Sequence, residues 1–293
     1  MKKVLFILLG VFGTLVLVIL LLIRVHVFWL QAPYYEVERV IPLPEPIMDM
    51  TAYEAIWDTH QRPYIYSIES PTGGEVVVLG IDHTKDPNSP QLDSIRERWT
   101  QLGPDVALVE GRVGNLFSWL QDPVEELGEG GMVTSLAHRA GVPLYSWEPP
   151  KTWEIERLLT QFDKEQLVMF YSFRPYFSNM RYGKPESPEA QLQEYLDSRT
   201  DNDYLRGVFT SWEELDAQWQ RDFPDLQWRD HDSGTGYPEG YLHDIWNASN
   251  LTRDEYMILV INELVGQGQK VIVTMGASHA PRIEACLAVM LTE

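Results

Sequence analysis

The sequence predicts an α/β fold with a central mixed β-sheet flanked by helices and one N-terminal transmembrane helix. Short apolar runs typical of buried strands alternate with stretches of helical period along most of the chain. A tight turn joins two of these runs as an antiparallel hairpin, and a long apolar segment stands apart at the N-terminus. Strands that alternate with helices favour parallel pairing, so the hairpin makes the expected sheet mixed.

The first element is the apolar segment Val4–Ile23, in which Thr14 is the one conventionally polar side chain. At about 1.5 Å per residue, this segment spans roughly the 30 Å hydrocarbon core of a bilayer. Lys2 and Lys3 precede it, which predicts a cytoplasmic N-terminus. The rest of the chain would then lie outside the cytoplasm, in a periplasm or at the cell exterior.

A cleaved signal peptide is the alternative for this segment. Its apolar region is normally about 7–15 residues long and ends at small residues, whereas residues 24–30 offer no such cleavage site. We therefore expect a signal anchor over residues 1–30 and a proline-rich linker over 31–50. A single domain is expected over 51–293, with a polar, aromatic helical insertion or lid at about 181–245.

Turn and cap residues mark the elements of this domain in order. Thr51 caps a short helix, Pro71–Gly74 forms the hairpin turn, Gly103 and Gly141 each end a helix, and Gly266 ends another. The expected strands cover 64–69, 75–80, 105–110, 143–147 and 270–275. The expected helices cover 51–60, 89–102, the part of 116–140 after a glycine-rich break, 152–176, 253–265 and 281–291.

Composition excludes several kinds of site. The formal net charge is −20, and no basic stripe is present, so we expect no nucleic-acid partner. Cys286 is the single cysteine, which excludes an intramolecular disulfide and a cysteine-based zinc site.

Two G-x-x-H turns end two of the predicted strands. Gly80–His83 follows the run over 75–79, and Gly276–His279 follows the run over 270–275. Functional groups gather at the carboxyl ends of strands in open α/β sheets. The repeated turn also suggests that the fold has two similar halves, each delivering one imidazole to the same sheet edge.

Carboxylates end two further strands, because Glu110 and Glu148 close the runs over 105–110 and 143–147. Two imidazoles with one or two carboxylates can bind a divalent metal or act as general bases on water. Arg253, before the last strand, could steady an oxyanion or orient a carboxylate. Structural alternatives stay open: Glu110 could pair with Arg112, Glu148 could be an exposed turn residue, and Arg253 could pair with a neighbouring acid.

The segments over 75–112 and 252–291 resemble the TraB/GumN/TIKI family, which is grouped with erythromycin esterases and ChaN-like haem-binding proteins. The resemblance lies in the two G-x-x-H motifs, the glutamate after the first, and an arginine followed by methionine before the second. These features match His83, Glu110, Arg253 with Met257, and His279. The resemblance covers 140–150 loosely and 181–245 hardly at all.

The resemblance implies a mixed sheet with a cleft that holds both histidines. TIKI members are membrane-tethered metalloproteases, erythromycin esterases activate water with similar residues, and ChaN-like members bind haem iron.

We therefore expect a membrane-anchored hydrolase of a peptide or ester bond, with His83, Glu110 and His279 as metal ligands or water-activating groups. Glu148 and Arg253 would assist. Mn, Co or Zn is the expected cofactor. The alternative is a non-catalytic surface protein that binds haem, a metal or a partner in the same cleft.

Overall fold

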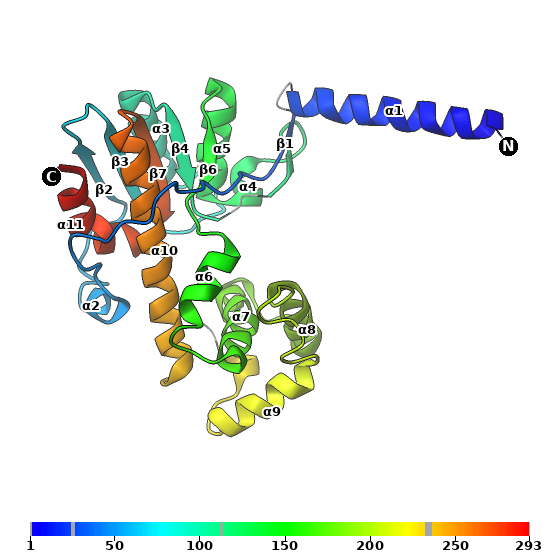
Figure 1. Ribbon diagram of the computed structural model, residues 1–293, viewed down its shortest axis with the longest axis vertical. Helices are drawn as coiled ribbons and strands as arrows, with labels where there is room; N and C mark the ends of the chain where they lie inside the picture. Colours follow the sequence, from blue (N-terminus) through cyan, green and yellow to red (C-terminus); the bar gives the residue numbers. More distant parts are fainter. Residues whose placement is uncertain (1, 25–26, 112–113, 232–235, 293) are drawn as a thin grey trace. The chain divides into compact units, whose positions relative to one another are not determined.

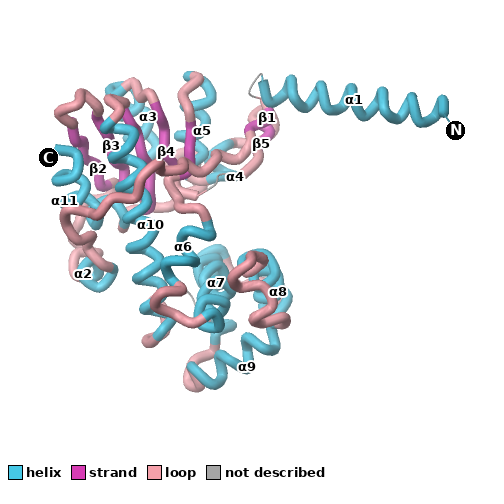
Figure 2. Tube along the Cα trace, viewed as in Figure 1, coloured by secondary structure: helices cyan, strands magenta, loops and turns pink. Residues whose placement is uncertain are grey.

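The computed structural model describes residues 2–24, 27–111, 114–231 and 236–292. The chain divides into two compact units. The sheet unit contains residues 1–48, 52–149 and 254–293, and the helical unit contains residues 49–51 and 150–253. Strands lie in the sheet unit, and the helical unit consists of helices and loops (Figure 2).

A five-stranded mixed sheet forms the centre of the sheet unit, in the order β2-β3-β7-β4-β6 (Figure 1). β2 pairs antiparallel with β3, whereas β3, β7, β4 and β6 run parallel to one another. The strands are β2 (Tyr64–Glu69), β3 (Glu75–Ile81), β4 (Val106–Val109), β6 (Leu144–Ser146) and β7 (Lys270–Gly276). The predicted fold class is confirmed, because the apolar runs form central strands that helices cover on both faces.

Helices α3 (Gln91–Leu102) and α5 (Glu129–Ala140) pack on one face of the sheet. Their apolar side chains form one buried cluster with alternate strand residues, among them Leu79, Val109 and Ile272. On the other face lie α11 (His279–Thr292) and the part of α10 (Tyr241–Gly266) that follows Arg253 (Figure 1). Helices therefore cover both faces of the sheet, and the ends of the strands are where a site can form.

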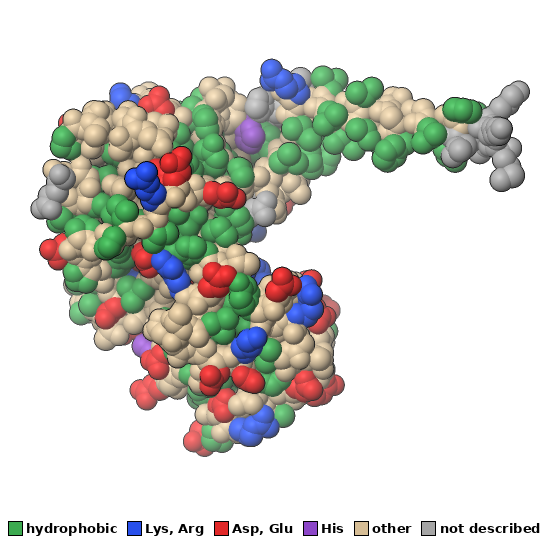
Figure 3. Space-filling view, viewed as in Figure 1, with side chains coloured by type: hydrophobic (Ala, Val, Ile, Leu, Met, Phe, Trp, Pro, Cys, Tyr) green, Lys and Arg blue, Asp and Glu red, His purple; other side chains and the backbone are tan. Residues whose placement is uncertain are grey.

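The N-terminal helix α1 (Lys2–Arg24) is exposed along most of its described length. Its segment Phe6–Arg24 has a mean hydropathy of 3.2 and is 0% buried. Figure 3 shows hydrophobic side chains along its length. The helix is long and apolar enough to cross a membrane, and burial of that surface in lipid would remove it from water.

Several short elements lie between the long helices and the central strands. A two-stranded antiparallel ribbon joins β1 (Phe28–Trp29) to β5 (Leu116–Phe117). Helix α2 (Met50–Glu54) is shorter than the expected helix over 51–60, and α4 (Pro123–Leu127) precedes α5. The glycine-rich segment was expected to be a break before a helix, but its residues Gly130 and Gly131 lie in the first turn of α5. Gly128 alone makes the turn between α4 and α5, with a φ of 69°.

The helical unit has its own apolar core, rich in aromatic side chains such as Phe173, Trp219 and Trp228. Its helices are α6 (Lys151–Leu158), α7 (Lys164–Asn179), η1 (Met180–Tyr182), α8 (Pro188–Arg199), α9 (Trp212–Asp222), η2 (Trp228–Asp230) and the first part of α10. The helix expected over 152–176 is two helices, because the capping box of Asp163 and Gln166 starts α7 anew.

A buried acid lies in the helical unit. The Glu154 side chain accepts a hydrogen bond of 2.6 Å from the Ser249 hydroxyl, and its carboxylate lies 3.8 Å from the Lys151 ammonium. Burial alone would raise the pKa of the Glu154 carboxyl. The positive charges of Lys151, Arg174 and Arg253 and the Ser249 hydrogen bond together outweigh burial, so the pKa lies below its ordinary value of 4.5.

Candidate functional site

The two G-x-x-H turns lie side by side because they end neighbouring strands. β3 and β7 pair in parallel, with Gly80 opposite Met275 and Ile81 opposite Gly276. The motifs are therefore displaced by one residue, and both histidines leave the same edge of the sheet. β4, which precedes Glu110, pairs with β7 on its other side. The topology thus places all three groups around the end of β7.

His83 is oriented by a carboxylate on α5. Its Nδ1 lies 2.6 Å from Oε1 of Glu129, whose other oxygen accepts the backbone N–H of Thr84 at 3.2 Å. The carboxylate thereby fixes the ring and requires a proton on Nδ1. Nε2 is left pointing toward Gly276, where it lies 3.1 Å from the position that a Cβ atom would occupy.

His279 has the same kind of partner on α10. Its Nδ1 is hydrogen-bonded to Oδ1 of Asp254, a fully buried carboxylate. The second oxygen of Asp254 lies 2.9 Å from Arg282, which is itself buried and donates from Nε to the Met48 carbonyl at 2.7 Å. This arrangement neutralises the buried acid and holds the His279 ring from behind.

Glu110 connects the two histidines. Its Oε2 accepts the Gly276 N–H at 2.6 Å, and its Oε1 lies 3.9 Å from Nε2 of His279. The same Oε2 lies 3.3 Å from the absent Cβ of Gly276, on which Nε2 of His83 also converges. Glu110 and the two Nε2 atoms therefore surround one small volume at the end of β7.

A cavity of about 170 Å³ opens on this cluster. Both histidines line it, together with the aromatic rings of Tyr53 and Trp57 and the Arg62 guanidinium. Arg62 lies 3.3 Å from the Asp82 carboxylate and 5.1 Å from the Trp57 ring centroid. The cavity thus combines aromatic walls with charged and imidazole side chains, as small-molecule and substrate sites commonly do.

The donor types at this cluster fit a divalent metal. Imidazoles and carboxylates are ligands of Mn²⁺, Co²⁺ and Zn²⁺. A histidine that binds a metal usually donates its other ring N–H to a carboxylate, as both histidines do here at Nδ1. Among the described residues, however, no three His, Cys, Asp or Glu side chains are already spaced to hold an ion. Binding would require His83, Glu110 and His279 to move closer together.

The other predicted site residues have different surroundings. Glu148 follows β6 and donates its backbone N–H to the Ser146 hydroxyl at 3.2 Å. Its predicted role as an assisting group therefore depends on its position after the strand. Arg253 is buried in the helical unit, where it donates to the Asn250 amide oxygen at 3.3 Å. Arg112, the alternative partner of Glu110, lies outside the described residues.

Sequence reasoning missed the two carboxylates that orient the imidazoles. Glu129 stands among glycines at the start of α5, and Asp254 lies within α10 beside Arg253. A glutamate between two glycines, Gly128 and Gly130, was the one local signal for Glu129. Asp254 carried none, because an acid in a helix usually faces solvent.

Comparison of the chain with protein-family models, curated proteins and solved structures finds no match. The resemblance to the TraB/GumN/TIKI family therefore stays a prediction, and the function must be argued from the geometry of the site.

Proposed function

We propose that this protein is a membrane-anchored hydrolase that cleaves a peptide or ester bond and uses a divalent metal ion. One observation supports the proposal above the others. Two imidazoles, each held at Nδ1 by its own carboxylate, present Nε2 toward a third carboxylate, Glu110, at the end of β7. A histidine oriented by a carboxylate can act as a general base.

The chain's own groups can carry the proton steps. Nε2 of His83 has one lone pair, because the ring's proton on Nδ1 is shared with Glu129. That lone pair would either hold the metal or, when no metal is bound to it, take a proton from water as that water attacks a carbonyl carbon. The protonated ring then returns this proton to the departing amine or alcohol. His279, held by Asp254, and Glu110 can accept hydrogen bonds from the attacking water on the opposite side.

The metal is proposed on the donor set of His83, Glu110 and His279. When bound there, Mn²⁺, Co²⁺ or Zn²⁺ supplies Lewis acidity for the carbonyl under attack. Glu129 and Asp254 would hold the two ligand rings in the required tautomer. Glu148 is proposed as an assisting group because of its place after β6.

Helix α1 is proposed as the membrane anchor. Its apolar surface suits a membrane span, and the two lysines at its start favour a cytoplasmic N-terminus, with the site outside the cytoplasm. The cleft would then act on a peptide or a small ester that reaches the outer face of the membrane.

Purification of the full chain in detergent micelles tests the proposal. Hydrolysis of p-nitrophenyl acetate and of a quenched fluorescent peptide is followed with Mn²⁺, Co²⁺, Zn²⁺ or a chelator, and bound metal is measured by mass spectrometry. We expect metal-dependent hydrolysis that His83→Ala and His279→Ala abolish. His243→Ala, which removes a histidine of the helical unit, is the matched control and should keep full activity.

Two outcomes contradict the proposal. Hydrolysis that survives both site substitutions would place the activity elsewhere. A haem absorption band lost in the two variants, without turnover of any substrate, would favour the non-catalytic binding protein instead.

A further inference from the structure

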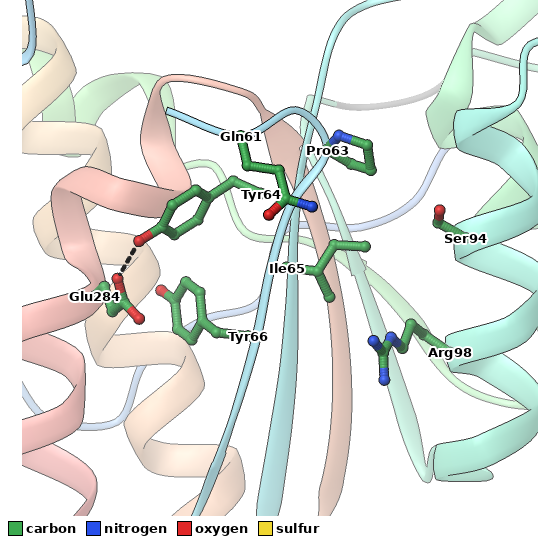
Figure 4. Close-up of a pocket in the computed structure, with 8 residues that line it drawn as sticks. All are labelled: Gln61, Pro63, Tyr64, Ile65, Tyr66, Ser94, Arg98 and Glu284. Carbon is green, nitrogen blue, oxygen red and sulfur yellow. Dashed lines mark hydrogen bonds between the residues drawn. The ribbon is translucent and has the colours of Figure 1, made fainter. Parts of the chain in front are cut away.

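The outer edge of the sheet forms a second cavity of about 490 Å³. Figure 4 shows it beside β2, with α3 on one side of the strand and α11 on the other. Its walls come from Tyr64, Ile65 and Tyr66 of β2, Ser94 and Arg98 of α3, and Glu284 of α11. The cavity therefore lies against the backbone of an edge strand.

The β2 edge is chemically ready to accept another strand. In the described sheet, β2 is terminal and pairs with β3 alone, so alternate residues direct backbone N–H and C=O groups outward. Natural edge strands are usually blocked by lysine, proline, a bulge or a covering element. β2 (Tyr64–Glu69) contains no lysine or proline, and its register with β3 is continuous from Tyr64–Gly80 to Glu69–Glu75.

The two walls of the cavity carry opposite charges. Arg98 lies on the α3 side, and Glu284 lies on the α11 side, where it accepts a hydrogen bond of 2.5 Å from the Tyr64 hydroxyl (Figure 4). Because successive side chains of a strand point to opposite faces, an added strand would present one residue to Arg98 and the next to Glu284. The cavity thus matches an extended peptide with alternating acidic and basic side chains.

The same edge leads to the candidate active site. Gln61 and Pro63 line the edge cavity, and Arg62 between them lines the cavity of His83 and His279. β2 runs antiparallel to β3, so its Tyr64 end lies at the edge from which His83 leaves β3. A peptide antiparallel to β2 would run in the direction of β3, with its carboxyl end toward the two histidines.

We propose that the substrate of this protein is an extended peptide that pairs with the outer edge of β2 and reaches the His83–His279 cavity with its carboxyl-terminal side. This inference rests on the proposed hydrolase function and narrows its substrate from a peptide or ester to a peptide in β conformation. Backbone pairing supplies affinity, and the Arg98 and Glu284 walls select the side chains.

The binding test uses a fluorescein-labelled peptide of twelve residues that alternates glutamate and lysine, with the full-length His83→Ala protein in micelles, so that no cleavage intervenes. We expect Arg98→Glu and Glu284→Arg each to weaken binding by about tenfold, which corresponds to about 1.4 kcal/mol. The double variant reverses both walls, and a shift of the peptide by one residue restores binding. Arg96→Glu, on the exposed side of the same helix, is the matched control and should bind like the parent.

N-methylation of the peptide tests the backbone pairing. In a bound strand, every second residue directs its N–H group toward β2. In an alternating peptide these residues are either all glutamates or all lysines, so methylation of one type blocks the pairing and methylation of the other does not. One set should abolish binding and the other should leave most of it. Equal effects of the two sets, an unrestored double variant, or no binding at millimolar peptide would each overturn the inference.

The failure of this inference is distinguishable from failure of the proposed function. If the unsubstituted protein hydrolyses esters but binds no peptide, the hydrolase proposal stands and peptide binding at the β2 edge is refuted. If the peptide binds with the expected N-methyl pattern but no substrate is hydrolysed, peptide binding at the β2 edge stands and the hydrolase proposal is refuted.

Discussion

Gly276 offers the sharpest test of the site, because its missing side chain leaves room for the reacting groups. A Cβ atom at this position would lie 3.1 Å from Nε2 of His83 and 3.3 Å from Oε2 of Glu110. Ordinary contacts between non-bonded heavy atoms are about 3.5–4.0 Å, so Gly276→Ala forces both groups to retreat by several tenths of an ångström. The backbone at Gly276 is not in the left-handed region, so alanine introduces no backbone strain.

The expected cost of Gly276→Ala falls on activity more than on stability. Misplacement of catalytic groups by about 1 Å can reduce a rate by about 100-fold, so a shift of several tenths predicts a loss of about tenfold. The overpacking cost of about 1 kcal/mol is partly offset by the reduced freedom of the unfolded chain, which favours alanine over glycine by about 0.4–1 kcal/mol. The unfolding temperature should therefore change little.

The assay compares kcat/KM for the fluorescent peptide and the thermal unfolding midpoint in the unsubstituted protein, Gly276→Ala and Gly266→Ala. Gly266 ends α10 with open space around its Cβ position, so its substitution should leave the activity unchanged. If Gly276→Ala folds normally and retains full activity, Nε2 of His83 and Oε2 of Glu110 have no part in the reaction.

Three further substitutions have defined outcomes. Glu129→Gln keeps the shape of the side chain but weakens its hold on His83, and should lower kcat or metal affinity by about 10–100-fold without changing the unfolding temperature. Asp254→Asn leaves the Arg282 charge buried and should destabilise the protein by about 3–5 kcal/mol in denaturant titrations; a loss below 1 kcal/mol would contradict this ion pair. Glu154→Gln tests pH dependence: because the folded pKa of Glu154 lies below 4.5, its carboxylate stabilises the fold above that pH, and the stabilisation is lost as pH falls through the folded value. The variant should show a flatter decline of stability in acid, and an unchanged acid limb would argue against the Glu154 contacts.

The strands were predictable because their signal is local. Runs such as Val76–Leu79 and Val271–Val273 are apolar over several consecutive residues, as a strand covered on both faces requires. Parallel pairing then follows from the intervening helices, and with it the gathering of His83, Glu110 and His279 at one edge. That much of the site follows from the order of elements alone.

The orienting carboxylates were not predictable, because their burial is a property of the assembled fold. Asp254 lies on a helix whose sequence offers no sign that this turn faces the end of β7, and its partner His279 is 25 residues away. Glu129 is 46 residues from His83 and lies in a segment whose glycines predict a break in the helix.

The close packing of Gly131 against the Pro123 carbonyl, where a Cβ would approach to 1.9 Å, explains why glycine occurs there within a helix.

The two imidazoles differ in exposure, and this difference predicts separate roles. The His83 side chain is 41% exposed, whereas that of His279 is 5% exposed and is held by a carboxylate that Arg282 neutralises. Water must reach the group that takes its proton, so the more exposed His83 is favoured as the base when no metal is bound to it, and His279 as the fixed positioning group. In a ¹⁵N-histidine spectrum, the Nδ1–H of His279 should persist as a slowly exchanging downfield signal that His279→Ala removes, while that of His83 exchanges rapidly. Slow exchange at His83 together with rapid exchange at His279 would reverse the assignment, because the base would then be the buried ring.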